Sequence, residues 1–177
     1  MENLAESRLF DGIADISMSE FTTPLAGGEG DPITSRLIKA GEAGIPRVVS
    51  FGGADMVLFA APFNIPDKFK NRPYYMHNKN LMFIRSTPEE NILFAEAAAE
   101  RLNASKGPVK VLLPLKGLSA VDIEGNVMYD PEADQALFTC LKEKLDKRIE
   151  VRELDFHIND DGFADAVAET LIGMLEK

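Results

Sequence analysis

The sequence predicts a three-layer α/β sandwich with a mainly parallel sheet. Four short apolar segments, at residues 13–17, 47–51, 109–113 and 150–154, alternate with segments whose apolar residues recur at helical spacing. Such alternation favours parallel strands joined by helical crossovers, as in Rossmann-like domains. Domains of that type usually open on a strand and a glycine-containing turn, whereas this chain opens on a helical segment. We therefore expect a Rossmann-like sheet that lacks its first strand.

Capping residues mark where the predicted helices begin. Asp31-Pro32 and Asp130-Pro131 each place an N-cap aspartate before a proline at the first helical position. Thr87-Pro88 starts a third helix, in which Glu90 completes a capping box. The predicted helices cover residues 2–9, 31–43, 88–102, 131–145 and a last segment that begins at Asp160 or Asp161, with Ala164, Val167, Ala168, Leu171 and Leu175 on its inner face.

Two connections between these elements differ in character. Residues 18–30 are polar and glycine-rich, and they predict a surface connection. The stretch 44–85 contains the 47–51 strand, the pair Gly52-Gly53, about twenty residues rich in Pro, Asn and aromatic side chains, and a strand at 81–84. Long ordered connections in compact domains are usually functional. We expect a binding site in this stretch.

Composition narrows the class of protein. The 177 residues predict one α/β domain over 1–177, and they contain 45% hydrophobic residues. The net charge of −10 argues against nucleic acid or an anionic membrane as the main partner, although local amides and one arginine can still bind an anion. No apolar run reaches the ~18 residues of a membrane span, and no signal-peptide core is visible. Cytoplasmic localisation and a small-molecule ligand are expected.

In a parallel sheet, ligands bind beyond the carboxyl ends of the strands, and most conspicuous polar residues of this sequence follow a strand. Glu20 and Asp55 are a possible carboxylate pair for acid–base work or Mg²⁺, and His157 is a second acid–base candidate. Each histidine can instead have a structural role, as a polar side chain that forms hydrogen bonds within its own loop. Gly52-Gly53 can form either a tight turn or an anion-binding turn. The candidate catalytic residues are Glu20, Asp55 and His157, and the candidate cofactor-binding residues are Gly52, Gly53, Asp55, His77, Asn78 and Asn159.

Several strong motifs are missing from the sequence. There is no GxGxxG fingerprint, no GxxxxGK[ST] loop, and no HxH, HExxH or CxxC spacing. No metal site is therefore predicted. Arg85 is expected to bind an anion or to form a structural ion pair, and Cys140 is expected in the core.

A family resemblance covers essentially the whole chain. The stretches GIPRVVSFGGADMVLFAAPFNIPDKFKNRPYYMHN, RSTPEENILFAEAAAERLN, GPVKVLLPLKGLSAVD, DPEADQALF and FHINDDGFADAV resemble, in order, the Tm-one-like ATP-binding-domain family. That family is typified by the N-terminal region of a tomato mosaic virus resistance protein. The resemblance implies a two-domain family of which this chain is the second α/β domain, N-terminally truncated. It also implies ATP with Mg²⁺ as a candidate cofactor, and either self-association or association with the missing N-terminal half.

Three functions follow as hypotheses. The first is a nucleotide- or small-anion-binding domain of a larger protein. The second is an enzyme of small-molecule metabolism that uses carboxylate and histidine side chains at the carboxyl edge of the sheet. The third is a protein-interaction or oligomerisation module.

Overall fold

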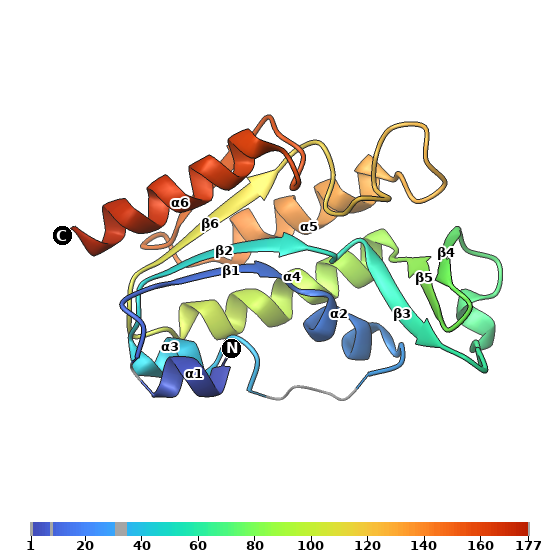
Figure 1. Cartoon of the computed structure of the whole chain (residues 1–177), viewed down its shortest axis with the longest axis horizontal. Helices are drawn as coiled ribbons and strands as arrows, with labels where there is room; N and C mark the ends of the chain where they lie inside the picture. Colours follow the sequence, from blue (N-terminus) through green and yellow to red (C-terminus); the bar gives the residue numbers. More distant parts are fainter. Residues whose placement is uncertain (1, 8, 31–34, 177) are drawn as a thin grey trace.

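A computed structural model describes residues 2–7, 9–30 and 35–176. Its main sheet has four parallel strands in the order β1-β2-β6-β7, with the carboxyl ends of the strands at the right in Figure 1. The strand bounds are Ile13–Ser17 for β1, Arg47–Gly52 for β2, Val109–Pro114 for β6 and Glu150–Leu154 for β7. The predicted α/β class and the parallel pairing are confirmed.

Helices cover both faces of the main sheet, which confirms the three-layer arrangement (Figure 1). On one face, Val48 of β2 and Leu112 of β6 pack against Phe163 and Val167 of helix α6. Side chains that point the other way belong to the larger core, which is shared with the helices on the opposite face. Strand β2 is buried along its whole length because both of its faces are covered.

The three long helices begin close to the predicted positions, but the predicted helix over residues 2–9 ends at Glu6, and the one over 31–43 is helical only at Lys39–Ala43, because residues 35–38 form a turn. The helices that flank the sheet are α4 (Pro88–Asn103), α5 (Pro131–Lys144) and α6 (Asp161–Leu175). The Thr87–Glu90 capping box is present at α4. Near the chain start lie α1 (Glu2–Glu6) and α3 (Lys39–Ala43), and Gly44 ends α3 in the left-handed conformation as expected. The predicted helix start at Asp31-Pro32 lies outside the described residues.

Two further details of the helix prediction were wrong. Residues 18–30 are not an irregular connection, because they contain helix α2 (Ser19–Ala26), which has no side-chain N-cap and carries Pro24 inside. No capping signal marks this helix in the sequence, because tertiary packing of the buried residues Phe21 and Thr22 stabilises it. On α6 the buried face contains Phe163, while Ala164, Ala168 and Leu175 are exposed.

The stretch predicted as a long loop is largely a second sheet. Strands β3 (Met56–Ala60), β5 (Leu81–Arg85) and β4 (Tyr74–Asn78) form an antiparallel sheet in that order, with a 3₁₀ turn η1 at Asp67–Phe69. Proline-rich residues 61–73 concealed the flanking strands in the sequence. β4 also lacks an alternating pattern, because all five of its residues are exposed. This sheet extends the molecule beyond the carboxyl end of the main sheet (Figure 1).

Within the described part of the chain, every helix is too short or too polar to cross a lipid bilayer.

The three-layer packing predicts the effect of one large-to-small substitution. Phe94 of α4 is fully buried in the larger core. Phe94→Ala is expected to lower the free energy of unfolding by about 3–5 kcal/mol, because it removes apolar contacts and leaves a cavity. Urea denaturation followed by circular dichroism measures the change. Ile172→Ala, an exposed position of α6, is the control and is expected to stay within about 0.5 kcal/mol of the unsubstituted chain. Equal losses would contradict the packing described.

Candidate functional site

Three chain segments meet at the end of β2, around Gly52 and Gly53. The Met18 amide donates to the Gly52 carbonyl at 2.8 Å, and the Gly53 amide donates to the Leu118 carbonyl at 2.9 Å. A side chain at Gly52 would approach the Ile16 carbonyl oxygen to 2.9 Å, and Gly53 has a φ of 73°. The glycine pair is therefore needed for a close crossing of β1, β2 and the loop after β6, and the Gly53 amide is committed inside the fold.

Asp55 and His157 are brought to the same place, where both contact Ser119. The Ser119 hydroxyl donates to Asp55 Oδ2 at 2.6 Å, and His157 Nε2 lies 2.9 Å from the Ser119 carbonyl oxygen. These residue types occur in catalytic triads, but here the histidine contacts the serine main chain and the aspartate contacts the serine hydroxyl directly. The order of contacts that activates a serine nucleophile is thus not formed.

The ring of His157 is held by main-chain groups at both nitrogens. Nδ1 accepts from the Asn159 amide at 3.1 Å, which leaves Nε2 to donate to the Ser119 carbonyl. The His157 amide in turn donates to Asp160 at 2.8 Å. In this arrangement His157 and Asn159 tie the segment after β7 to the loop after β6.

Asp55 also belongs to a buried charged cluster at the carboxyl edge. Arg85 donates to the Asp55 carbonyl at 2.8 Å and to Asp134 Oδ1 at 2.6 Å, so the structural ion pair foreseen for Arg85 is formed. Burial raises the pKa of Asp55 to about 6; the hydrogen bond from Ser119 and the charge of Arg85 oppose this rise, and Asp122 adds to it. The pKa of Arg85 is raised, because its neighbouring carboxylates outweigh the effect of burial.

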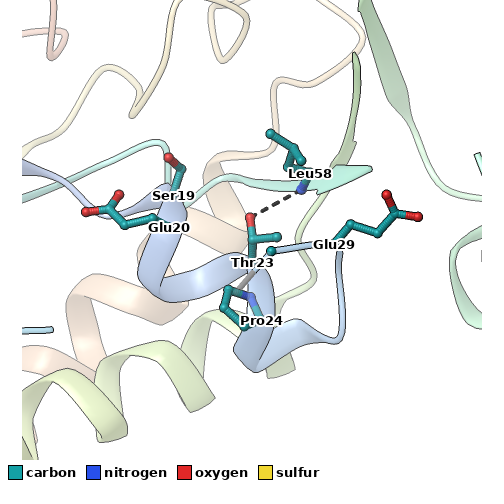
Figure 2. Close-up of a pocket in the computed structure, with 7 residues that line it drawn as sticks. Ser19, Glu20, Thr23, Pro24, Glu29 and Leu58 are labelled. Atoms are coloured by element: carbon teal, nitrogen blue, oxygen red, sulfur yellow. Dashed lines mark hydrogen bonds between the residues drawn. The ribbon is translucent and has the colours of Figure 1, made fainter. Parts of the chain in front are cut away.

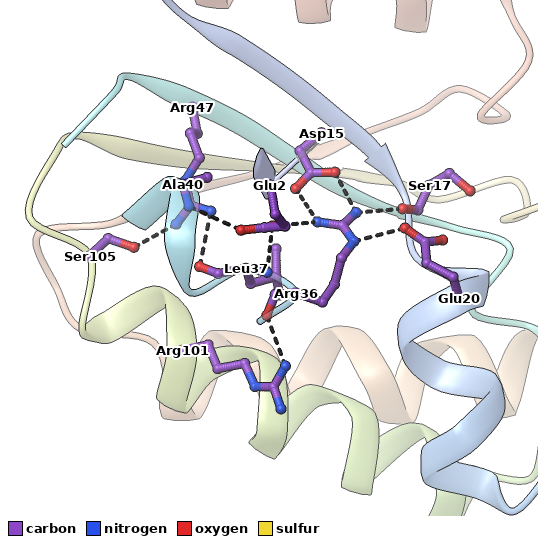
Figure 3. Close-up of polar contacts among 10 residues, drawn as sticks. All are labelled: Glu2, Asp15, Ser17, Glu20, Arg36, Leu37, Ala40, Arg47, Arg101 and Ser105. Carbon is purple, nitrogen blue, oxygen red and sulfur yellow. Dashed lines mark hydrogen bonds and ion pairs between the residues drawn. The ribbon is translucent and has the colours of Figure 1, made fainter. Parts of the chain in front are cut away.

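Glu20 has a different partner from the one expected. It accepts from Arg36 Nε at 2.7 Å, while the same guanidinium holds Asp15 through two hydrogen bonds of 2.5 Å (Figure 3). Glu2 also contacts Arg36, and its carboxylate accepts from the amides of Leu37 and Ala40. Arg36 therefore joins α1, β1 and α2 through a buried ion-pair network, in which Glu20 is the outermost carboxylate.

His77 and Asn78 lie on the second sheet. His77 is exposed on β4, beside the rings of Tyr75 and Phe83. The Asn78 side chain accepts from the amides of Asn80 and Leu81, and so shapes the turn between β4 and β5. Among the described residues, neither side chain contacts Asp55, Ser119 or His157.

A pocket of about 320 Å³ opens beside helix α2 (Figure 2). Ser19 sits in the first turn of this helix, and its hydroxyl has no hydrogen-bond partner among the described residues. The side chains of Glu20 and Glu29 point in opposite directions in Figure 2, and Thr23 accepts from the Leu58 amide at 3.2 Å. Its lining residues are Ser19, Glu20, Thr23, Pro24, Glu29, Gly30 and Leu58.

No group of three or more His, Cys, Asp or Glu side chains that could hold a metal ion occurs in residues 2–7, 9–30 and 35–176.

Sequence reasoning missed several charged residues that matter here, namely Asp15, Arg36, Asp122 and Asp134. Two of them carried a weak signal. Asp15 interrupts an apolar strand, and Asp134 lies among apolar residues on the inner side of α5. A charge in a buried position predicts a partner, although it does not say which residue that partner is.

The fold and the pocket define an α/β domain with a four-stranded parallel sheet, a small antiparallel sheet and a pocket at the carboxyl edge of the parallel sheet. The chain belongs to the uncharacterised protein family UPF0261 as its C-terminal domain, whose sequence pattern matches residues 1–175.

Relatives share this sequence over nearly its whole length. A UPF0261 protein of Clostridium tetani is 40% identical over 178 residues, covering 100% of this chain and 44% of its own length. A UPF0261 protein of Rhizobium meliloti is 38% identical, covering 94% of this chain and 42% of its own length. The ToMV resistance protein Tm-1(GCR237) of Solanum lycopersicum is 37% identical, covering 100% of this chain and 24% of its own length. The chain thus spans less than half the length of these relatives, and the resemblance to the tomato protein is confirmed.

The two histidines provide a matched pair of substitutions. His157→Ala is expected to lower the free energy of unfolding by about 1–3 kcal/mol, because the Ser119 carbonyl and the Asn159 amide lose their partner. His77→Ala on exposed β4 is expected to change it by less than about 0.5 kcal/mol. Thermal or urea unfolding of both variants measures the difference. A fully stable His157→Ala protein would show that the ring does not hold these loops together.

Proposed function

We propose that this domain binds a phosphate-bearing small molecule, with ATP and Mg²⁺ as the leading candidate, in the pocket beside α2. The observation that carries the proposal is the position of Ser19, whose unpartnered hydroxyl lies in the first turn of α2 and lines the pocket. The first-turn amides of a helix have no partner within the helix, and they favour negative charge. The pocket also lies at the carboxyl edge of the sheet, where domains of this type usually bind ligands.

The charges around the pocket favour a metal-complexed phosphate over a bare one. Glu20 and Glu29 both line it, and each keeps one carboxylate oxygen without a hydrogen-bond partner among the described residues. Two carboxylates repel a free phosphate, whereas Mg²⁺ is commonly held by one or two carboxylates together with the phosphates of its ligand.

The residues present fit such a ligand in part. The Ser19 hydroxyl and the amides of Ser19 and Glu20 would hold a phosphate, since the Phe21 and Thr22 amides already donate to the Met18 carbonyl, and the Glu20 carboxylate would hold the metal. Glu29 at the other end would accept a hydrogen bond from a sugar hydroxyl. A volume of about 320 Å³ is at the lower end of small-molecule pockets, which suits part of a nucleotide. When bound, Mg²⁺ would neutralise phosphate charge.

The proposal predicts Mg²⁺-dependent binding. ATP with Mg²⁺, at a hundredfold excess over its Kd, is expected to raise the melting temperature by about 5–10 °C, and ATP alone by much less. Ser19→Ala is expected to weaken binding about tenfold, because a hydrogen bond to a charged group is lost. Glu20→Gln keeps an acceptor for Arg36 but removes a negative charge. It should therefore reduce the difference in melting-temperature shift between ATP with Mg²⁺ and ATP alone. Thermal shift and calorimetric titration measure these effects.

Matched controls come from the same chain. Ser7→Ala and Glu132→Gln change an exposed serine and an exposed first-turn glutamate outside the pocket, and both should leave binding unchanged. The proposal is refuted if ATP gives no shift with or without Mg²⁺, or if the pocket variants bind as the controls do.

The enzyme hypothesis has weaker support. Asp55 has a pKa near neutrality, as a general base requires. Its side chain is, however, fully buried, and both ring nitrogens of His157 are engaged with the main chain.

A second proposal concerns partners: the domain associates with the remaining part of its family's longer chain. Two observations favour it. The chain spans less than half the length of its UPF0261 relatives. Exposed apolar side chains also gather on the segments that follow β6 and β7, namely Leu115, Ile123, Val127, Tyr129 and Phe156. Apolar side chains grouped in this way mark interaction surfaces.

Light scattering tests this association. The chain mixed with the unmatched region of the Clostridium tetani relative is expected to form a complex, and Val127→Asp should abolish it without lowering the free energy of unfolding. Ile172→Asp, at an exposed position of α6 outside these segments, is the matched control and should still bind. A mixture in which both components stay separate would count against the association.

A further inference from the structure

One face of the small antiparallel sheet carries a line of aromatic side chains that starts beside the pocket. Residues that are directly opposite each other in an antiparallel pair lie on the same face of the sheet. Leu58 of β3 is opposite Phe83 of β5, and Phe83 is opposite Tyr75 of β4. The centroid of the His77 ring is 5.6 Å from that of Phe83 and 6.3 Å from that of Tyr75. We call Phe83, His77 and Tyr75 the aromatic row.

Leu58 connects the aromatic row to the pocket beside α2. Leu58 lines this pocket together with Ser19, and the side chains of the two residues point the same way in Figure 2. Directly opposite residues of an antiparallel pair have Cβ atoms about 4.5–5.5 Å apart, so Phe83 lies one strand beyond the pocket wall. A ligand that enters the pocket therefore has a surface of aromatic rings next to it.

The two faces of the small sheet differ in what covers them. Side chains on one face belong to the larger core, namely Val57, Phe59, Met82 and Ile84. On the other face Tyr75 and His77 are exposed and Phe83 is half-buried. Apolar ring surface that the protein leaves open in this way, beside a pocket, indicates a place for a ligand.

The geometry of the pocket indicates which ligand group the aromatic row suits. With Ser19 at a phosphate and Glu29 at a sugar hydroxyl, the remaining part of a nucleotide is its base. Glu29 accepts from the Ala60 amide of β3 at 2.9 Å, so the sugar position lies on the strand that carries Leu58. The pocket volume of about 320 Å³ is at the lower end of the range for small-molecule sites, and the base is expected to lie outside it.

We propose that the aromatic row binds the base of a nucleotide whose phosphates occupy the pocket. This inference rests on the function proposed above, and it assigns a second part of the same ligand. The base stacks on the rings of Phe83 and His77, and Tyr75 borders it on the side of β4. Aromatic side chains hold nucleobases in this way because flat rings stack favourably in an offset arrangement.

Calorimetric titration separates the base from the phosphates. ATP and inorganic tripolyphosphate are compared, each with Mg²⁺, and ATP is expected to bind about tenfold more tightly because only ATP has a base to stack. Phe83→Leu keeps an apolar side chain without the ring, and His77→Ala removes the neighbouring ring. Each variant is expected to weaken ATP binding by about fivefold or more and to leave tripolyphosphate binding unchanged.

Tyr74→Ala is the matched control for these variants. Tyr74 is next to Tyr75 in β4 and is 56% exposed. It is opposite Ile84, however, and therefore lies on the other face of the sheet. This variant should bind both compounds as the unsubstituted chain does.

Proton NMR provides a second readout, because the chain contains only two histidines. Their ring signals are assigned by the loss of one set in His77→Ala. A stacked base is expected to shift the His77 signals through its ring current when ATP binds, whereas tripolyphosphate should not move them. His157 is buried and held by main-chain groups at both ring nitrogens, so its signals should stay in place.

The outcomes distinguish this inference from the function on which it rests. Equal affinities for ATP and tripolyphosphate, or His77 signals that do not move in the ATP complex, would overturn the aromatic row as a base site and leave the phosphate pocket standing. If neither compound binds, the proposed function fails, and the base site fails with it.

Discussion

The crossing at Gly52 and Gly53 is the constraint on which the carboxyl edge depends. The end of β2 makes one backbone hydrogen bond to the segment after β1 and one to the loop after β6. The space around Gly52 has no room for a side chain. This close approach sets where Ser19 begins α2 and where Ser119 meets Asp55. The pocket, the Ser119–Asp55 hydrogen bond and the His157 contacts are therefore arranged around one backbone junction.

Charge is distributed around that junction in two buried networks. On the side of β1 and α2, Arg36 forms ion pairs with Glu2, Asp15 and Glu20. On the side of β5 and α5, Arg85 donates hydrogen bonds to Asp134 and to the Asp55 carbonyl. Breaking a buried pair is costly because it leaves an uncompensated charge. These networks therefore fix the relative positions of elements that are far apart in the sequence, and Glu20 extends from the first of them to the pocket.

The fold class was predictable because the apolar periodicity and the capping residues are local signals. The four strands of the main sheet and the starts of α4 and α5 lie where Thr87-Pro88, Asp130-Pro131 and the apolar segments indicate. β3 and β4 were not predicted, because pairing with β5 forms them, and β4 buries none of its side chains. Helix α2 was missed for a related reason, since its N-terminus has no side-chain cap and packing alone holds it.

The sequence by itself determined that polar residues follow the strands of a parallel sheet, and it named Glu20, Asp55 and His157 among them. Only the tertiary structure decided their partners, because each partner lies far away in the chain: Arg36 for Glu20, and Ser119 for both Asp55 and His157. Strand order and loop packing set those distances, and no local pattern encodes them. For the same reason the sequence left Asp134 and Asp122 unremarked, although Asp134 is the buried partner of Arg85 and Asp122 accepts from the Leu118 amide.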